Sequence, residues 1–197
     1  MPAVSTFTCS GGVTMSGSDL GSKVLDRVKE DRGIMERLAS IFPGYHGYKN
    51  KEKLRETDDV VRRTIYREMS EFTVQLRRHY QRLVRLSRRD LAREVERLYL
   101  RCDAVAQQIL HAPRGYKPLA GAMRIGEADL EDLIKFDSSL ADQIAELREK
   151  IYELGDAIGK GRMDDVESII GEVELIIERL SGLMRERESL LEGAGEV

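Results

Sequence analysis

Residues 130–158 read LEDLIKFDSSLADQIAELREKIYELGDAI, and this stretch decides the fold class of the 197-residue chain. Its apolar residues recur at spacings of three, four and seven: Leu130, Leu133, Leu140, Ile144, Leu147, Ile151, Leu154 and Ile158. Such a heptad pattern is typical of a helix in a coiled coil or bundle, and we predict a helix over 127–158. Gly159-Lys160-Gly161 then predicts a tight turn, and a second apolar helix of similar length follows over 163–191. We therefore predict an antiparallel helical hairpin at the C-terminal end of this sequence.

The preceding sequence is also helical in pattern. We predict helices over 18–42, 49–86 and 89–110, with a break or kink at Ser87-Arg88-Arg89-Asp90, which has capping-box spacing. The seam of the helix over 49–86 consists of Leu54, Val61, Ile65, Phe72, Leu76, Tyr80 and Leu83. No strand or β-hairpin pattern appears. The prediction is an all-α fold: one elongated bundle of about five helices over 18–192, with tails at 1–17, expected to be disordered, and at 193–197.

Composition and motifs argue against several classes of protein. Two cysteines, Cys9 and Cys102, are too few for a disulfide framework, which favours a reduced, cytoplasmic setting. No run approaches the ~20 apolar residues of a membrane span. Phosphate-loop, nucleophile-elbow and Glu-x-x-His patterns are missing, and His46, His79 and His111 are isolated in sequence, so we expect exposed, structural histidines. We predict no catalytic residues, no cofactor and no metal.

Charge is strongly divided along the chain. Residues 62–126 carry 15 basic and 6 acidic residues, whereas residues 127–197 carry 8 basic and 20 acidic residues. Helical spacing predicts one arginine-rich face as a candidate site for phosphates or a partner: Arg78, Arg82, Arg85, Arg89, Arg93 and Arg97. The favoured alternative is that these arginines pair with acids of the C-terminal hairpin, such as Glu146, Glu149 and Glu153. A membrane surface is less favoured, because the apolar stripe beside the arginines is needed for the core.

Two Gly-Tyr segments interrupt the helices, at 43–48 and 113–118. The candidate motif residues are Tyr45, Gly47, Tyr48 and Tyr116. A positive φ or a close backbone approach is expected at Gly47. We favour a structural role, in which tyrosine rings plug the end of the bundle and each hydroxyl bonds to a helix terminus. The alternative is a recognition loop.

The first of these segments also carries a resemblance to a protein family. The matching residues are Pro43-Gly44-Tyr45-His46-Gly47-Tyr48, Lys51-Glu52, Arg55-Glu56 and Asp58. With these residues the chain resembles an uncharacterised family of small helical proteins from bacteria and archaea, whose motif is P-G-Y-x-G-Y-x-x-K-E-x-x-R-E-x-D. The likeness extends loosely over 34–192, through Ala112 to Tyr116 and Glu131 to Asp137, and departs around 117–126. It implies a helical fold and transfers no activity.

These observations favour a non-enzymatic cytoplasmic protein that mediates protein–protein interaction or self-assembly. Two adjacent apolar rows after Met163, Ile169 with Ile170 and Ile176 with Ile177, predict a homodimer or higher oligomer, because one row needs a second surface. The alternative is a nucleic-acid- or ribosome-associated protein that binds phosphates through the arginine-rich face.

Overall fold

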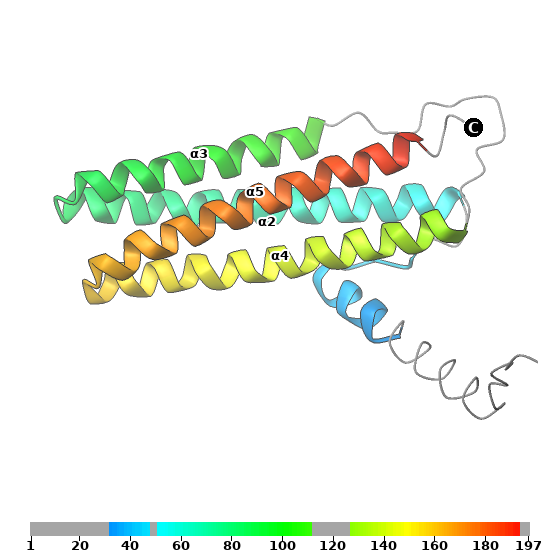
Figure 1. The fold of residues 1–197 in the computed structure, drawn as a ribbon, viewed down its shortest axis with the longest axis horizontal. Helices are drawn as coiled ribbons and strands as arrows, with labels where there is room; N and C mark the ends of the chain where they lie inside the picture. Colours follow the sequence, from blue (N-terminus) through cyan, green and yellow to red (C-terminus); the bar gives the residue numbers. More distant parts are fainter. Residues whose placement is uncertain (1–31, 48–50, 112–126, 194–197) are drawn as a thin grey trace, which may run out of the picture. The chain divides into compact units, whose positions relative to one another are not determined.

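The computed structural model describes residues 32–47, 51–111 and 127–193, and these are almost entirely helical (Figure 1). A helical segment over 32–41 precedes four long helices: α2 (Lys51–Arg85), α3 (Arg89–His111), α4 (Glu127–Lys160) and α5 (Met163–Gly193). The described residues contain no strand. The predicted all-α class is therefore confirmed.

The chain divides into two units, residues 1–36 and residues 37–197. In the described part of the first unit, Arg32 donates to Glu36 one helical turn on, at 3.1 Å between Nε and Oε1. The four long helices belong to the second unit, which contains everything discussed below.

Helices α2 to α5 form a bundle made of two helical hairpins. Helix α2 packs against α3, and α4 packs against α5, which confirms the predicted C-terminal hairpin. The hairpins meet through α2 against α4 and α3 against α5, so that α2 and α5 face each other diagonally across the core. Both interhelical turns, after α2 and after α4, therefore lie at the same end of the bundle (Figure 1). We call this the turn end and the other the opposite end.

The bundle core uses the predicted seams. Fully or nearly fully buried side chains include Val61, Ile65, Phe72, Leu76, Leu83, Leu140, Ile144, Leu147, Ile151 and Leu154. In α5, Ile170, Ile176 and Ile177 are buried and Ile169 is half-buried, because α5 packs against both α4 and α3. Both apolar rows are thus covered within one chain. The two apolar rows therefore do not by themselves indicate a homodimer.

Candidate functional site

The spacing of the arginines predicts one helix face, but in the structure these arginines lie on two helices. Helix α2 ends at Arg85 and α3 begins at Arg89, and the chain reverses direction between them. The expected break or kink is therefore a full turn. It places Arg78, Arg82 and Arg85 on the last turns of α2, and Arg89, Arg93 and Arg97 on the first turns of the antiparallel α3. The six arginines are gathered around one end of the bundle.

Most of these arginines have no acidic partner. Within the described residues, no ion pair is formed by Arg78, Arg82, Arg85, Arg89 or Arg93, and all five are exposed. Arg97 approaches Glu94 of its own helix at 4.0 Å. We call the five unpaired residues the arginine cluster.

The acids that had been expected to neutralise these arginines have other partners. Glu146 accepts from Arg179, and Glu153 accepts from Lys150. Glu149 is exposed and forms no ion pair with the arginine cluster in the described part of the chain. Among the arginines of α3, Arg101 does meet the C-terminal hairpin, where it pairs with Glu174 of α5 at 3.1 Å. The predicted pairing with Glu146, Glu149 and Glu153 is therefore wrong.

Hydrogen bonding fixes the turn that presents the cluster. The Arg88 amide donates to the Leu83 carbonyl, and the Ser87 amide donates to the Val84 carbonyl, both at 3.0 Å. This is a Schellman cap, which requires a left-handed residue, here Ser87 with φ of 59°. The turn after α4 has the same two bonds, with Gly161 at φ 72° in the left-handed position. A serine in this conformation is uncommon and costs more than a glycine does.

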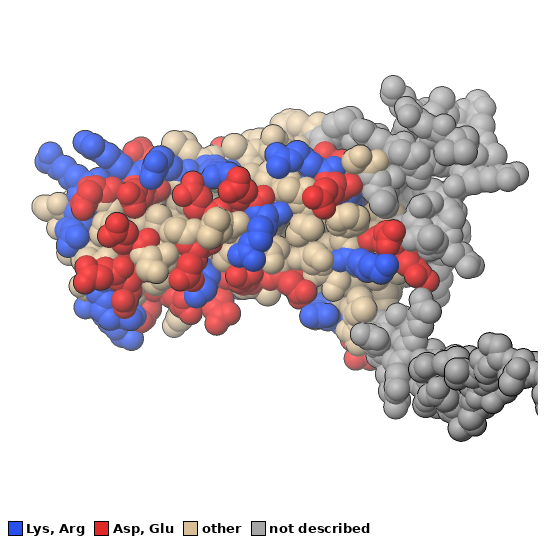
Figure 2. All heavy atoms as spheres, in the orientation of Figure 1, with Lys and Arg blue, Asp and Glu red and all other residues tan. Residues whose placement is uncertain are grey.

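The second turn adds basic groups beside the cluster. The Arg82 guanidinium lies next to Gly159, where a Cβ would be 3.5 Å from its nitrogens. Lys160 and Arg162 follow in the α4–α5 turn, and both pair with Asp156 at 2.9 Å. Figure 2 shows Lys and Arg side chains at the rim of this end of the bundle, with Asp and Glu side chains between them.

Two apolar side chains also lie at the turn end. Val84 is 46% exposed and Leu86 is 48% exposed, so neither belongs to the core. Their neighbour Leu83 is fully buried and supplies the apolar contact of α2. The apolar stripe beside the arginines, with Leu83, Leu91 and Val95, is buried in the core as expected, and Val84 and Leu86 lie outside that stripe.

The opposite end of the bundle contains a second group of charged residues. Unlike the arginine cluster, these residues are mostly buried and are hydrogen-bonded to one another. Arg187 of α5 is completely buried and donates to Asp137 of α4 at 2.8 Å. The same guanidinium donates through its Nη1 to Asp58 of α2, across the diagonal of the bundle. Tyr45 is also buried, and its hydroxyl donates to the other oxygen of Asp137 at 3.0 Å.

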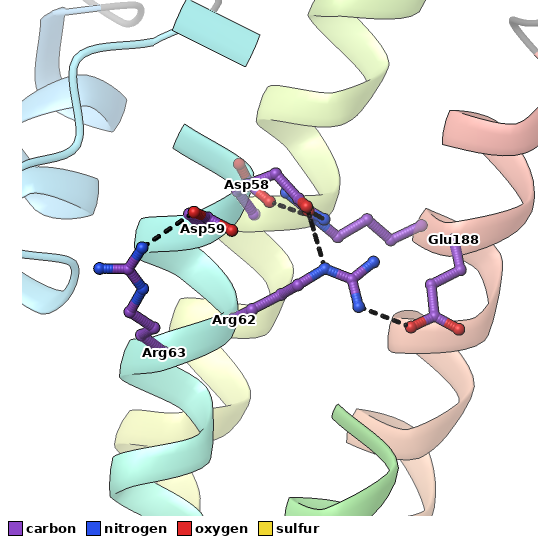
Figure 3. A network of polar contacts seen from close by, with 7 residues as sticks. Asp58, Asp59, Arg62, Arg63 and Glu188 are labelled. Carbon is purple, nitrogen blue, oxygen red and sulfur yellow. Dashed lines mark hydrogen bonds and ion pairs between the residues drawn. The ribbon is translucent and has the colours of Figure 1, made fainter. Parts of the chain in front are cut away.

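The network continues along α2. Arg62 donates from Nε to both Asp58 oxygens, at 3.1 and 3.0 Å, and from Nη1 to Glu188 of α5 at 3.1 Å. Figure 3 shows Arg62 reaching towards Glu188, while Arg63 pairs with Asp59 on another side of the helix. We call Tyr45, Asp58, Arg62, Asp137, Arg187 and Glu188 the buried network.

The buried network explains the position of the first Gly-Tyr segment. Tyr45 plugs the bundle as expected, although its hydroxyl bonds to a carboxylate rather than to a helix terminus. The Thr57 hydroxyl donates to the carbonyl of Gly47 at 3.2 Å, and the φ of Gly47 is 70°, which confirms the expected positive value. Tyr48 and Tyr116 lie outside the described residues.

Sequence reasoning missed the buried network, although a signal was present. Asp58, Asp137 and Arg187 each occupy a seam position of their helix, three or four residues from apolar residues of the sequence on either side along the chain. Asp137, for example, lies four residues after Leu133 and three before Leu140. A charge at such a position must be buried with a partner, because an isolated buried charge is very costly. Three such charges in three helices predict one shared site.

The remaining residues that the sequence singled out are Cys102 and the three histidines. Burial raises the pKa of Cys102 to about 12, so its thiol stays protonated at neutral pH. His46 and His111 are exposed as expected, but His79 is half-buried between α2 and α4. Among the described residues, no three metal-binding side chains converge. In the same part of the chain, no helix is both long and apolar enough to cross a bilayer.

Comparisons with known proteins give no relative. No family model, no curated protein and no solved structure matches the chain. The resemblance carried by the Pro-Gly-Tyr motif therefore stays a prediction.

Proposed function

We propose that this protein is a non-enzymatic binding protein whose turn end holds a phosphate-bearing anionic partner. One observation carries the proposal: five exposed arginines lie around one turn without an acidic partner in the described residues. Elsewhere in the bundle, charged groups such as Arg101, Arg148 and Arg187 have one. Gathering like charges costs free energy through self-repulsion, which a bound anion would relieve.

The chemistry of the cluster suits phosphate. Guanidinium groups present planar pairs of donors that match two phosphate oxygens, and they stay charged at any physiological pH. The side chains start from two helices joined by a capped turn, so their Cα atoms are held in place before binding. An array of this kind contacts the backbone of a polyanion and reads no sequence by itself.

Nucleic acid is the phosphate-bearing partner named by the alternative hypothesis from the sequence. Its binding can be tested directly. Binding of the full chain to a labelled DNA duplex should be followed by fluorescence anisotropy at several salt concentrations. Five phosphate contacts predict a fall in affinity of roughly 500-fold between about 50 and 200 mM salt. Binding to no phosphate-bearing ligand at the low salt concentration, or affinity that ignores salt, would overturn the proposal.

A matched control is available at the opposite end. Arg185 of α5 is also exposed and forms no ion pair among the described residues. The change Arg185→Glu should reduce affinity far less than Arg85→Glu, since only the second lies in the cluster. Equal losses would mean that net charge, and not the turn end, governs binding.

Protein–protein interaction or self-assembly, the function that the sequence favoured, ranks second. Three of the four isoleucines of α5 that suggested a dimer are buried within one chain, and Ile169 is half-buried. The remaining support for self-assembly is exposed apolar side chains such as Leu100 and Leu175. Light scattering of the full chain at micromolar concentration tests self-assembly. A mass above the 22.4 kDa of one chain would restore the dimer as a proposal, and a clean monomer would remove it.

A further inference from the structure

The turn after α2 carries exposed apolar side chains between basic ones. These apolar side chains are not part of the bundle core. Residues 82–89 read RLVRLSRR, and in this stretch Leu83 alone is fully buried. Val84 and Leu86 are about half exposed, between arginines on both sides. The Schellman cap at Ser87 holds this arrangement at the extreme end of the bundle.

We infer that the turn end docks on the surface of an anionic lipid bilayer, with the arginine cluster on the headgroup phosphates and Val84 and Leu86 in the layer beneath. The inference rests on the proposed function, because it names the phosphate-bearing partner of the same cluster. It adds a role for the two apolar side chains. Basic side chains that flank exposed apolar ones are the composition of peripheral membrane-binding surfaces.

The position of the cluster also suits a flat partner. Both interhelical turns lie at the same end of the bundle (Figure 1), and the Arg82 guanidinium of α2 lies beside Gly159, near the end of α4. A nucleic-acid backbone would use the arginines, but it would leave Val84 and Leu86 in water or against charged phosphates. The charge pattern permits both partners, and the apolar pair favours the lipid surface.

The test separates the two partners with one pair of variants. Sedimentation of the full chain with vesicles of phosphatidylcholine, with and without phosphatidylserine, measures lipid binding. Anisotropy with a DNA duplex is measured on the same samples. The variant Val84→Ser/Leu86→Ser removes the apolar pair and keeps every arginine. The matched control is Leu100→Ser, a change of a somewhat more exposed leucine (55%) on α3 that lies outside the 82–89 stretch.

The expected result is binding to phosphatidylserine-containing vesicles and little binding to phosphatidylcholine alone. Val84→Ser/Leu86→Ser should weaken vesicle binding roughly 10-fold, from the lost burial of two half-exposed side chains, and leave duplex binding unchanged. Arg85→Glu/Arg89→Glu should weaken vesicle binding by at least roughly 10-fold. Leu100→Ser should alter neither. Circular dichroism should give the same helix content for all variants.

Three outcomes would overturn the inference. Duplex binding without vesicle binding would assign the cluster to nucleic acid and leave the proposed function standing. Vesicle binding that ignores Val84→Ser/Leu86→Ser would place the lipid contact elsewhere on the chain. Binding to neither ligand at low salt would remove both the inference and the proposed function.

Discussion

The two ends of this bundle differ in the burial and pairing of their main groups of charged residues. At the opposite end, Asp58, Asp137 and Arg187 are buried and bonded to one another across three helices. At the turn end, the arginine cluster is exposed and lacks acidic partners within the described residues. Burial makes pairing necessary for stability, because an unpaired buried charge is strongly destabilising. An exposed charge is solvated by water and needs no partner within the chain, so the unpaired arginines remain available to bind another molecule.

The largest expected effect comes from breaking the buried network. Arg187→Met leaves Asp58 and Asp137 without the guanidinium that joins them, and should lower the free energy of unfolding by about 3–5 kcal/mol. Urea unfolding monitored by circular dichroism measures this. The comparison variant is Arg85→Met in the cluster, which should change stability by less than about 0.5 kcal/mol. Similar losses in both variants would erase the distinction between the two ends.

Tyr45 tests how the Gly-Tyr segment contributes to the buried end. Tyr45→Ala removes a buried ring and should cost about 3 kcal/mol of unfolding free energy. Tyr45→Phe keeps the ring but leaves an oxygen of Asp137 without this donor, and should cost about 1–2 kcal/mol. The same urea titration distinguishes them. An unchanged free energy of unfolding in Tyr45→Ala would contradict the structural role and favour a recognition role for this residue.

The two turns at the turn end allow a reciprocal test. Ser87 and Gly161 occupy the same position of the same cap, with φ values of 59° and 72°. Ser87→Gly should raise stability by about 1 kcal/mol, because glycine adopts this conformation without steric cost, and Gly161→Ser should lower it by a similar amount. Thermal unfolding of both variants checks the sign. A loss of stability in Ser87→Gly would show that the serine side chain supports the turn.

His79 should make stability depend on pH near neutrality. Burial between α2 and α4 lowers the pKa of His79 below its ordinary 6.5; the nearby Arg82 lowers it further, and a hydrogen bond with the Ile151 backbone opposes both. The unfolded chain therefore binds this proton more readily than the folded chain does. The contribution is complete above pH 6.5 and is lost as the pH falls below that value. Unfolding measured from about pH 7.5 to pH 5 should show this loss, and His79→Gln should remove part of it.

Periodicity predicted the helices well, because each long helix buries one apolar stripe that is visible in sequence. The predicted helix over 49–86 is found at Lys51–Arg85, and the predicted hairpin after Leu130 is present. The arrangement of charges was less accessible. Whether Arg78 and Arg89 share a face depends on the direction of the chain after Ser87. That direction is set by the positive φ of Ser87 itself. The heptad positions of Asp58, Asp137 and Arg187 did hold that information.

The central claim is that the arginine cluster serves binding and not stability. Its most direct test is the unfolding free energy of Arg85→Glu/Arg89→Glu, measured in urea at low salt against the parent chain. Arg85 lies at the C-terminal end of α2, where a positive charge is favourable, and Arg89 lies at the N-terminal end of α3, where it is unfavourable, so the two dipole contributions should offset each other. Relief of repulsion within the cluster adds a small gain. We predict a stability equal to that of the parent within about 0.5 kcal/mol, or slightly higher. A loss of more than about 2 kcal/mol would show that these arginines hold the bundle together, and would contradict the account.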